Sequence, residues 1–592
     1  LFNNNIVYEV RLKEAMENNL LCPFHYFGIS DLIVDGETLD ELSDFTRLTS
    51  DKRVNHIIEK LNYYGYSGDR VKGLVFCSSK REAQILSDAF NSRGFRTTSL
   101  TGEDGQEKRE KEIEKLIADS GDILDYIFTV DIFNEGIDIP EVNQVVMLRP
   151  TQSAIIFIQQ LGRGLRKNKD KDFVVIIDFI ANYKNNFLIP IALSGDRSYD
   201  KDTARKFLSQ GNRYLPGMST IHFDNISKQR IYSAIDNVKL NTWLFISDEY
   251  NKLKNKLGRI PAYYDFENYD TLDIKKIFEV AGSYYAFLSK KDRDYSYNGK
   301  ISKTAENMLN FVSTNLILSK KIEELILLRL ILKNSQNLEE DFRGVMLTDY
   351  TKLIADYELE VSRKILTNNF VTSSVTKKKF NDCIFLDEYN KVVKPSKELE
   401  KELQSNIFRT LLTELVEYGI YRYNKYYKAN LYRDTNFVLY EKYSFEDICK
   451  LFSWSINYVP LAIGGYKYDE QTKTLPVFIN YDIDENSFNH DYVHGFLPDN
   501  GFTSMSKPRR NLESKECEYF YKDETKIYLF MRKNKDDKDG ARIFYFLGEM
   551  KTVGEPELVH REKSGDTVLQ FFYKLQTPLR EDMYEYFTRE KI

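Results

Sequence analysis

The chain has 592 residues, and its 84 Lys and Arg residues nearly balance its 90 Asp and Glu residues, for a net charge of −6. At roughly 150 residues per domain, this length predicts about four structural units. The balance of charge excludes a protein that is basic all over, so a surface for nucleic acid must be local. A hydrophobic content of 42% and a charged content of 29% are typical of a folded soluble protein.

The aromatic and cysteine contents indicate which side chains are available for the core and which redox compartment the chain belongs to. Aromatic residues make up 14% of the chain and are almost all Tyr and Phe, which supply both core side chains and surfaces for stacking. The five cysteines show no paired spacing, which favours a reducing cytoplasm and argues against a zinc finger. No apolar run reaches the roughly 18 residues of a membrane-spanning helix, so we expect no contact with a membrane. The chain starts at Leu1 rather than Met, and we expect it to be a piece of a longer polypeptide.

Residues 1–70 show few regular patterns, and we interpret them as a connector. From residue 71 onward, apolar runs alternate with helical patterns. Strands are predicted at 71–77, 95–99, 124–129, 144–148 and 173–178, and helices at 80–94 and 106–118. Such alternation is typical of a parallel sheet, so residues 71–195 are predicted to form a parallel α/β domain.

Residues 196–440 are predicted to be mostly helical, and residues 441–592 to be rich in β-strands. In KIEELILLRLILK, at 321–333, apolar residues form a stripe wide enough for a buried helix of a bundle. The β-rich region contains aromatic and β-branched segments, as strands prefer, at 474–481, 526–531, 541–549 and 567–575. The fold class is thus a multidomain chain with a parallel α/β part, a helical part and a β-rich part.

Three motifs of the α/β domain occur in order, each at the end of a predicted strand or at the start of a helix. They are VFCSS at 75–79, FTVDIFNEGIDIP at 128–140 and QQLGRGLR at 159–166. These segments resemble motifs IV, V and VI of superfamily 2 helicases. The resemblance implies the second RecA-like lobe of an ATP-driven nucleic-acid motor.

Arg163 and Arg166 are three residues apart, which places both on one face of a helix. Two guanidiniums on one face can reach a γ-phosphate across a cleft and stabilise charge during phosphoryl transfer, so both are candidate catalytic residues. The alternative is that they lie on a solvated helix end. The resemblance further implies nucleotide contacts from Gly136, Asp138 and Gln159, and contacts to nucleic-acid phosphates from Thr101, Gly102 and Thr129.

The cofactor expected is ATP with Mg²⁺. The sequence, however, contains no G-x-x-x-x-G-K-[ST] phosphate loop and no Asp-Glu box that follows a strand. We therefore expect half of an ATPase site, with the first RecA-like lobe outside the chain, and no ATP hydrolysis by this chain alone.

The β-rich region carries a second resemblance. Segments 443–481, 500–516 and 543–550 resemble the C-terminal region of SauUSI-like type IV restriction enzymes, which combine a nuclease, a helicase, a helical coupler and a reader of modified cytosine. The resemblance implies a helical coupler at 196–440 and an SRA-like reader at 441–592 that flips a modified base into a pocket. The endonuclease chemistry would lie outside this chain.

A pocket for a flipped base needs aromatic faces and nearby donors for phosphate. The candidates for the modified-base pocket are Trp454, Tyr466, Tyr468 and Tyr481, and those for a phosphate clamp are Ser504, Ser506, Lys507, Arg509 and Arg510. The competing interpretation is that Trp454 and half of these tyrosines belong to the core and that 504–510 is a solvated loop.

No metal site is predicted, because His490 and His494 are four residues apart but no third ligand has suitable spacing. The predicted function is a cytoplasmic, ATP-dependent restriction system against phage, which recognises 5-methylcytosine or 5-hydroxymethylcytosine in double-stranded DNA and translocates on it for cleavage. Further copies of the chain, in a homo-oligomer, are also expected as partners. Two alternatives stay open: a repair or remodelling helicase whose last domain reads DNA structure, and a motor whose last domain recruits proteins.

Overall fold

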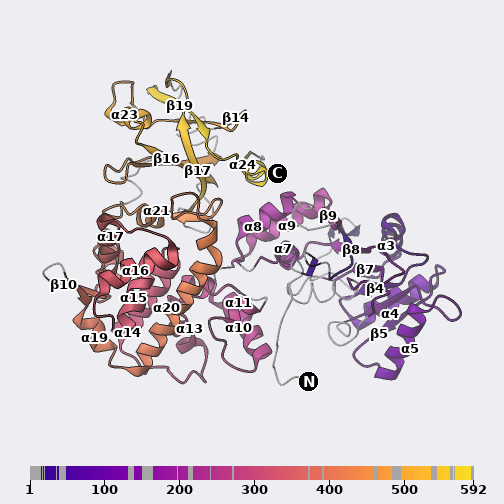
Figure 1. Ribbon diagram of the computed structural model, residues 1–592. Helices are drawn as coiled ribbons and strands as arrows, with labels where there is room; N and C mark the ends of the chain where they lie inside the picture. The colour runs from indigo at the N-terminus through magenta and orange to yellow at the C-terminus, as the bar shows by residue number, and fades with distance from the viewer. Residues whose placement is uncertain are drawn as a thin grey trace. The chain divides into compact units, whose positions relative to one another are not determined.

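Two units make up the chain, Leu1–Asp273 and Ile274–Lys591, and each is described by itself (Figure 1). The computed structural model describes residues 15–16, 18, 20–34, 37–38, 48–130, 139–149, 165–196, 198–210, 218–240, 242–269, 272–370, 374–389, 392–458, 465–482, 495–534, 543–560, 565 and 567–588.

A sheet of seven strands forms the centre of the first unit, in the order β5-β6-β4-β7-β8-β1-β9. All neighbouring strands pair in parallel. The strands are β1 (Phe24–Ser30), β4 (Gly73–Phe76), β5 (Thr97–Leu100), β6 (Tyr126–Thr129), β7 (Gln144–Met147), β8 (Val174–Ile180) and β9 (Thr220–Phe223). The central strands β4, β6, β7 and β8 are buried along their whole length, as in a sheet covered on both faces. The parallel α/β prediction and its five strands are confirmed.

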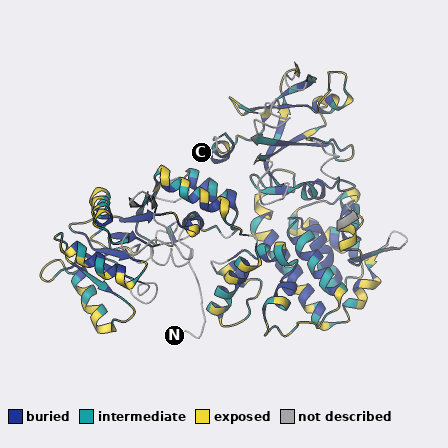
Figure 2. Ribbon diagram, turned by 180° about the vertical axis from the view of Figure 1, so that it is seen from behind, coloured by how far each residue is buried: buried dark blue, intermediate teal, exposed yellow. Residues whose placement is uncertain are grey.

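Helices alternate with these strands. The first three are α3 (Asp51–Tyr64), α4 (Lys80–Asn91) and α5 (Gln106–Ile117), and they are followed after β8 by α7 (Leu188–Ser194), α8 (Lys201–Gln210), α9 (Asn225–Asn237), α10 (Trp243–Leu257) and α11 (Asp265–Asn268). Ser79 caps α4 by accepting a hydrogen bond from the amide of Glu82. Figure 2 shows the outer face of α5 exposed, in agreement with its single buried residue, Leu116.

The interpretation of residues 1–70 as a connector is wrong for the described part of this range. Strand β1 pairs in parallel with both β8 and β9, and helix α3 packs on α4, so β1 and α3 belong to the sheet domain. The sheet also continues past residue 195, because β9 is its last strand. The partners of β1, β8 and β9, lie about 150 and 195 residues further along the chain.

The second unit begins with helices, as predicted for this region. They are α12 (Lys275–Ala281), α13 (Tyr284–Lys291), α14 (Lys303–Phe311), the π-helix η3 (Val312–Ile317), α15 (Glu323–Leu332), α16 (Leu338–Tyr350), α17 (Asp356–Leu366), α18 (Ser374–Lys379), α19 (Lys397–Glu402) and α20 (Asn406–Tyr426). The predicted buried helix at 321–333 corresponds to α15, which packs on α16, α17 and α20. A two-stranded hairpin, β10 (Leu386–Tyr389) and β11 (Val392–Pro395), lies between α18 and α19.

A mixed sheet completes the second unit, in the order β13-β16-β17-β19-β15-β14, with β12 paired to β17 and β18 paired to β19. Only the β13–β16 pairing is parallel among those described for this sheet. The strands are β12 (Lys442–Ser444), β13 (Thr474–Asp482), β14 (Gly495–Leu497), β15 (Gly501–Met505), β16 (Lys526–Asn534), β17 (Ile543–Thr552), β18 (Glu557–His560) and β19 (Thr567–Leu575). Three helices accompany them: α21 (Phe445–Leu451), α23 (Lys515–Tyr521) and α24 (Glu581–Thr588).

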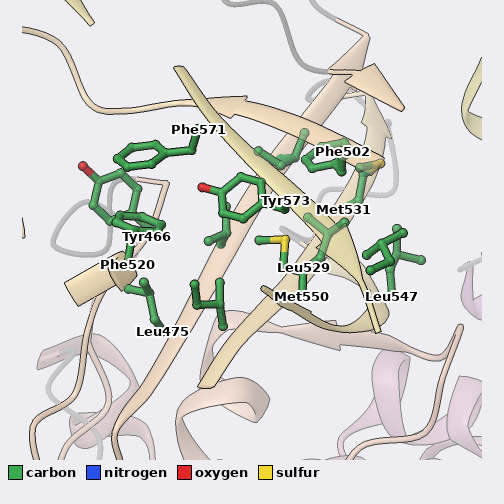
Figure 3. Close-up of a cluster of buried hydrophobic side chains, with 14 of the residues drawn as sticks. Tyr466, Leu475, Phe502, Phe520, Leu529, Met531, Leu547, Met550, Phe571 and Tyr573 are labelled. Atoms are coloured by element: carbon green, nitrogen blue, oxygen red, sulfur yellow. The ribbon is translucent and has the colours of Figure 1, made fainter. Parts of the chain in front are cut away.

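Aromatic and aliphatic side chains from several strands fill the core of this sheet domain, among them Phe502, Leu529 and Tyr573 (Figure 3). The β-rich part starts before residue 441, however. Phe437 packs its ring 5.0 Å from that of Phe546 on β17, and the amide of Tyr440 donates to the carbonyl of Phe546. The described structure therefore places the start of the β-rich part near residue 431, where Leu431 bridges to Val438.

Candidate nucleic-acid interface

The carboxyl ends of the parallel strands bring the segments that follow β4, β5 and β6 to one edge of the first unit. Parallel strands end at a common edge, and ligands of open α/β sheets bind there. The segment Cys77–Ser79 follows β4, Thr101 and Gly102 follow β5, and Thr129 ends β6. β4, β5 and β6 are direct neighbours in the sheet, so the structure brings these segments of the chain together.

The loop after β4 is held by a buried network of charges. The Glu82 carboxylate accepts hydrogen bonds from both the amide and the hydroxyl of Ser78, the amide at 2.8 Å. Its other oxygen lies 3.0 Å from the guanidinium of Arg53, which in turn lies 2.8 Å from the carboxylate of Asp31. The Arg53 and Glu82 side chains are 0% exposed. We refer to Asp31, Arg53 and Glu82 as the buried triad.

The buried triad connects three elements of the sheet edge: the end of β1, helix α3 and the first turn of α4. Burial alone would lower the pKa of Arg53, but the charges of Asp31 and Glu82 raise it above the ordinary value. The guanidinium also donates to the carbonyl of Leu48 at 2.7 Å. Because a buried charge is stable only when it is paired and hydrogen-bonded, the triad fixes the loop Ser78–Ser79 in one conformation.

The threonines predicted to contact phosphates differ in accessibility. The Thr101 amide donates to the Asp104 carboxylate at 2.8 Å, and Gly102 next to it is exposed. The Thr129 side chain is 0% exposed, and its hydroxyl has no hydrogen-bond partner among the described residues. A phosphate role for these three residues stays a prediction.

Of the residues predicted to contact nucleotide or to act in catalysis, only Arg166 is described, and its side chain is exposed. A group that reaches a phosphate across a cleft must be accessible, so Arg166 fits this role. The residues that lie outside the described part of the chain are Gly136, Asp138, Gln159 and Arg163.

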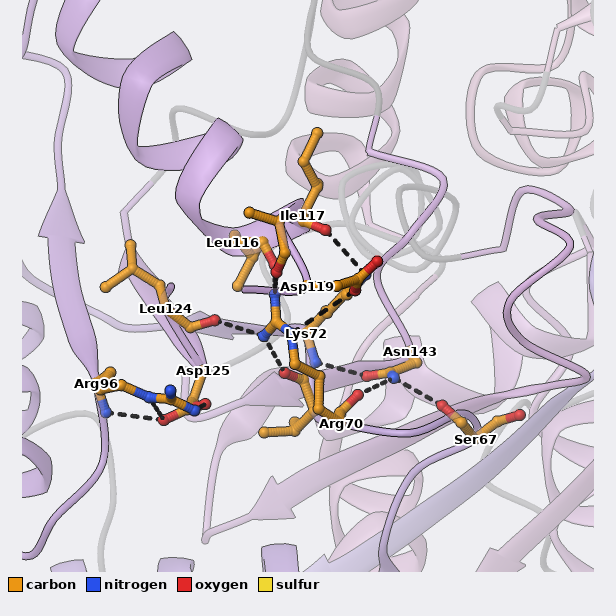
Figure 4. A network of polar contacts seen from close by, with 12 residues as sticks. Ser67, Arg70, Lys72, Arg96, Leu116, Ile117, Asp119, Leu124, Asp125 and Asn143 are labelled. Carbon is orange, nitrogen blue, oxygen red and sulfur yellow. Dashed lines mark hydrogen bonds and ion pairs between the residues drawn. The ribbon is translucent and has the colours of Figure 1, made fainter. Parts of the chain in front are cut away.

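The opposite edge of the sheet carries a second polar network, which has a structural role (Figure 4). The Arg70 guanidinium donates to the carbonyls of Leu116, Ala118 and Leu124. The Lys72 ammonium donates to the carbonyl of Ile117 at 2.9 Å and lies 2.8 Å from Asp119. Positive groups at the end of α5 satisfy its last carbonyls and favour its dipole, so they anchor this helix to the sheet.

In the β-rich part, the structure brings two predicted segments together around one hydroxyl. The Tyr466 hydroxyl donates to the Glu516 carboxylate at 3.1 Å and accepts from the amide of Lys507 at 3.5 Å. The Arg510 guanidinium also donates to Glu516, at 2.8 Å. We refer to Tyr466, Lys507, Arg510 and Glu516 as the Glu516 cluster. The sequence analysis did not identify Glu516, because no motif around this residue indicates a binding site.

The two serines of the predicted phosphate clamp are buried, which corrects that part of the prediction. Ser504 is 2% exposed, and its hydroxyl donates to Tyr573 at 3.1 Å. The Ser506 hydroxyl accepts from the amide of Leu569 at 2.9 Å, inside the sheet. These hydroxyls satisfy buried partners and are not directed at a ligand. Arg509 is exposed, with a left-handed φ of 61° that turns the loop outward.

The four aromatic residues predicted for a base pocket have different surroundings. Trp454 is 0% exposed and its indole N–H donates to Thr474 at 2.8 Å, so it is a core residue and not a stacking surface. Tyr466 is also buried, with its ring against Phe520. The two half-buried rings are Tyr468, stacked on Tyr519 at 4.2 Å, and Tyr481, stacked on Phe496 at 5.6 Å.

Comparison with known proteins gives three matches to family models. Residues 53–168 match the helicase conserved C-terminal domain, residues 246–428 match a domain of unknown function, DUF8090, and residues 437–587 match another, DUF3427. The first unit therefore contains a segment, residues 53–168, that matches a helicase C-terminal domain. This segment carries the loop after β4 and the threonines of the sheet edge.

Curated relatives and solved structures match parts of the chain. The putative ATP-dependent helicase IRC3 of Saccharomyces cerevisiae is 30% identical over 33% of this chain and 29% of its own length. The pre-mRNA-splicing ATP-dependent RNA helicase PRP28 of Yarrowia lipolytica is 29% identical over 23% of this chain and 22% of its own length. The chain thus spans less than a third of either relative. The match to the DNA-bound Type ISP restriction-modification enzyme LlaBIII covers 69% of this chain and 26% of the enzyme's chain, at 16% identity. Its TM-score is 0.26, too low to indicate a shared fold.

A search of the described helices finds none that is both long and apolar enough to cross a membrane. Among the described residues, no group of three or more His, Cys, Asp or Glu side chains is arranged to hold a metal ion.

Proposed function

We propose that this chain is the C-terminal part of an ATP-dependent restriction enzyme that recognises 5-methylcytosine or 5-hydroxymethylcytosine in double-stranded DNA and translocates on it for cleavage. The observation that carries the proposal is the combination, in one chain, of a helicase C-terminal domain and a separate mixed-sheet domain with a basic loop. The resemblance of segments 443–481 and 500–516 to modification-directed enzymes supports the choice of modified DNA.

In this proposal, the edge of the parallel sheet binds the nucleic-acid backbone through Thr101 and Gly102, beside the loop that the buried triad fixes, while the buried Thr129 supports this edge from within. Arg166, together with Arg163, holds the γ-phosphate of a nucleotide. ATP with Mg²⁺, when bound between this domain and a first RecA-like lobe, supplies the free energy for translocation. An accessible guanidinium stabilises negative charge on a phosphoryl group at little reorganisation cost.

The β-rich part contributes recognition. Flipping a base out of the duplex costs a few kcal/mol of free energy, and stacking and hydrogen bonds in the pocket offset this cost. Of the four aromatic residues predicted for the pocket, Tyr468 and Tyr481 are the two that are not buried, and Lys507, Arg509 and Arg510 form the basic loop of this part. This arrangement revises the sequence-based pocket, since Trp454 and Tyr466 hold the core instead.

Binding of matched duplexes to the full 592-residue chain tests the proposal. The duplexes differ only in one cytosine, which is unmodified, 5-methylated or 5-hydroxymethylated, and fluorescence anisotropy reports the dissociation constants. Burial of one methyl group contributes about 0.8 kcal/mol, so a preference of about four-fold or more for the methylated duplex is expected. Equal affinity for all three duplexes would favour a repair or remodelling helicase that reads DNA structure.

A further inference from the structure

One carboxylate of the β-rich part lies among donors from two separate segments of the chain, the strand-like segment of Tyr466 and the loop 507–510. Glu516 accepts from the Arg510 guanidinium at 2.8 Å and from the Tyr466 hydroxyl at 3.1 Å, and the Lys507 ammonium lies 3.8 Å away. The Lys507 ammonium also sits over the Tyr466 ring, 4.5 Å from its centre. A guanidinium, an ammonium and a phenol that converge on one acceptor form a typical binding site for an oxyanion.

The Glu516 cluster is accessible, unlike the enclosed ion pairs of the same unit. The side chains of Arg510 and Glu516 are 33% and 35% exposed, whereas those of Lys321 and Glu324 are each 1% exposed. An ion pair open to water contributes little to stability, so replacing one partner by a ligand costs little. The Lys321–Glu324 pair, in contrast, offers no route for a ligand.

The electrostatic environment of the cluster favours an anion. Burial raises the pKa of the Glu516 carboxyl, but the hydrogen bond from Arg510 and the charge of Lys507 outweigh it and hold this pKa below its ordinary value. Burial also lowers the pKa of Lys507, and the nearby charges of Arg510 and Lys467 add to this effect. Two cationic side chains, Lys507 and Arg510, thus share one resident carboxylate.

We propose that Glu516 occupies the place of a DNA backbone phosphate, and that duplex DNA binds the β-rich part by displacing this carboxylate from Arg510, Lys507 and the Tyr466 hydroxyl. The inference rests on the proposed DNA binding of this part. The displaced carboxylate is already partly in water, and the phosphodiester takes over its donors. Glu516 therefore weakens binding to every duplex, modified or not, and acts as an internal competitor.

The test replaces Glu516 by Gln in the full chain, which keeps the shape and the hydrogen-bond acceptor but removes the charge. Glu518→Gln is the matched control, because Glu518 lies on the same helix α23, is exposed and carries the same charge. Anisotropy titrations with modified and unmodified duplexes should show that Glu516→Gln binds both about five-fold tighter or more, as expected for removing a like charge about 4 Å from a phosphate. Glu518→Gln should change either affinity by less than about two-fold, because screening weakens distant exposed charges.

Two further measurements decide the interpretation. The slope of log affinity against log salt should become steeper in Glu516→Gln, because in the unaltered chain the displaced carboxylate keeps its negative charge beside the bound phosphate and offsets part of the charge of the cluster. Adding Arg510→Ala to Glu516→Gln should remove the gain. The proposal is overturned if Glu516→Gln binds no tighter than the unaltered chain, or if it melts at a lower temperature and binds more weakly, because Glu516 would then only connect the loop to α23. A gain without any preference for modified cytosine would leave this inference standing and refute the proposed recognition of modified bases.

Discussion

The Arg53 guanidinium lies 2.8 Å from the Asp31 carboxylate in a fully enclosed ion pair, with side chains that are 0% and 1% exposed. The pair joins the end of β1 to α3, and through Glu82 it extends to the loop of the first helicase-like motif. A region interpreted as a connector from the sequence thus supplies two of the three charges that hold this loop.

Replacing Asp31 by Asn should destabilise the sheet domain by about 3–5 kcal/mol, because breaking a buried ion pair leaves an uncompensated charge. Hydrogen exchange of the β4 and α4 amides measures the effect within the first unit. Asp51→Asn is the control: Asp51, the first residue of α3, pairs with Arg93 just after α4 but is 87% exposed, so its loss should cost less than about 1 kcal/mol. Equal effects of the two substitutions would contradict the structural role of the buried triad.

Asp178 predicts an unusual pH dependence for the same unit. This carboxyl is enclosed in β8 beside the Tyr26 hydroxyl at 2.5 Å, and burial raises its pKa to about 7, although the hydrogen bond from Tyr26 opposes the shift. Between the ordinary pKa of about 4 and about 7, the folded state holds a proton that the unfolded state releases. The Asp178 contribution to stability is therefore fully present below about pH 4 and decreases as pH rises to about 7.

The comparison of the unaltered chain with Asp178→Asn isolates this contribution from those of other carboxyls. The difference in the free energy of unfolding between the two proteins, followed by hydrogen exchange of β8 amides, should change steadily between about pH 4 and pH 7 and level off above. A difference that is constant over this range would show that Asp178 titrates at an ordinary pKa.

Local signals account for what the sequence predicted correctly. The strands and helices between residues 73 and 180 were found because each carries its own apolar run or cap, such as Ser79 before α4. Strand β1 was missed because its short segment FHYFGIS contains Gly28 and follows Pro23, without the continuous apolar run of β8. Ser504 of β15 and Ser506 just after it were misjudged because their hydroxyls are satisfied inside a sheet, by Tyr573 and the Leu569 amide, and such partners depend on register. The buried triad could have been suspected only in part, from the Ser79–Glu82 spacing of a capping box.

Substitution of Arg163 or Arg166 should abolish most of the ATP hydrolysis by an enzyme that contains both RecA-like lobes. Changing either to Ala should lower the rate of ATP hydrolysis by about a thousand-fold or more, as for other arginines that stabilise a transferred phosphoryl group. DNA binding should persist, because neither side chain is assigned to the nucleic-acid backbone. Lys169→Ala, an exposed charge three residues after Arg166, should leave turnover near normal. Near-normal hydrolysis by both arginine variants would show that the motif assignment is wrong.

Substitutions at Tyr468 and Trp454 distinguish a ring that stacks on a base from a ring that only packs in the core. Tyr468 is two residues from Tyr466, and its half-buried ring stacks on Tyr519 of α23, the helix that also carries Glu516. We expect a base whose phosphate binds the Glu516 cluster to contact this ring. Tyr468→Ala should therefore weaken binding to the modified duplex by about 1–3 kcal/mol, the usual effect of losing one stacking partner. Its effect on the unmodified duplex should be smaller.

Trp454→Phe serves as the comparison for Tyr468→Ala. It removes the hydrogen bond to Thr474 and part of a buried ring, so it should lower the melting temperature of the second unit. The ratio of affinities for modified and unmodified duplexes, measured on folded protein, should stay unchanged because this ring cannot reach a base. If Trp454→Phe removed the preference while Tyr468→Ala kept it, the pocket for the modified base would lie at Trp454 after all, and the core assignment of that residue would have to be abandoned for the DNA-bound state.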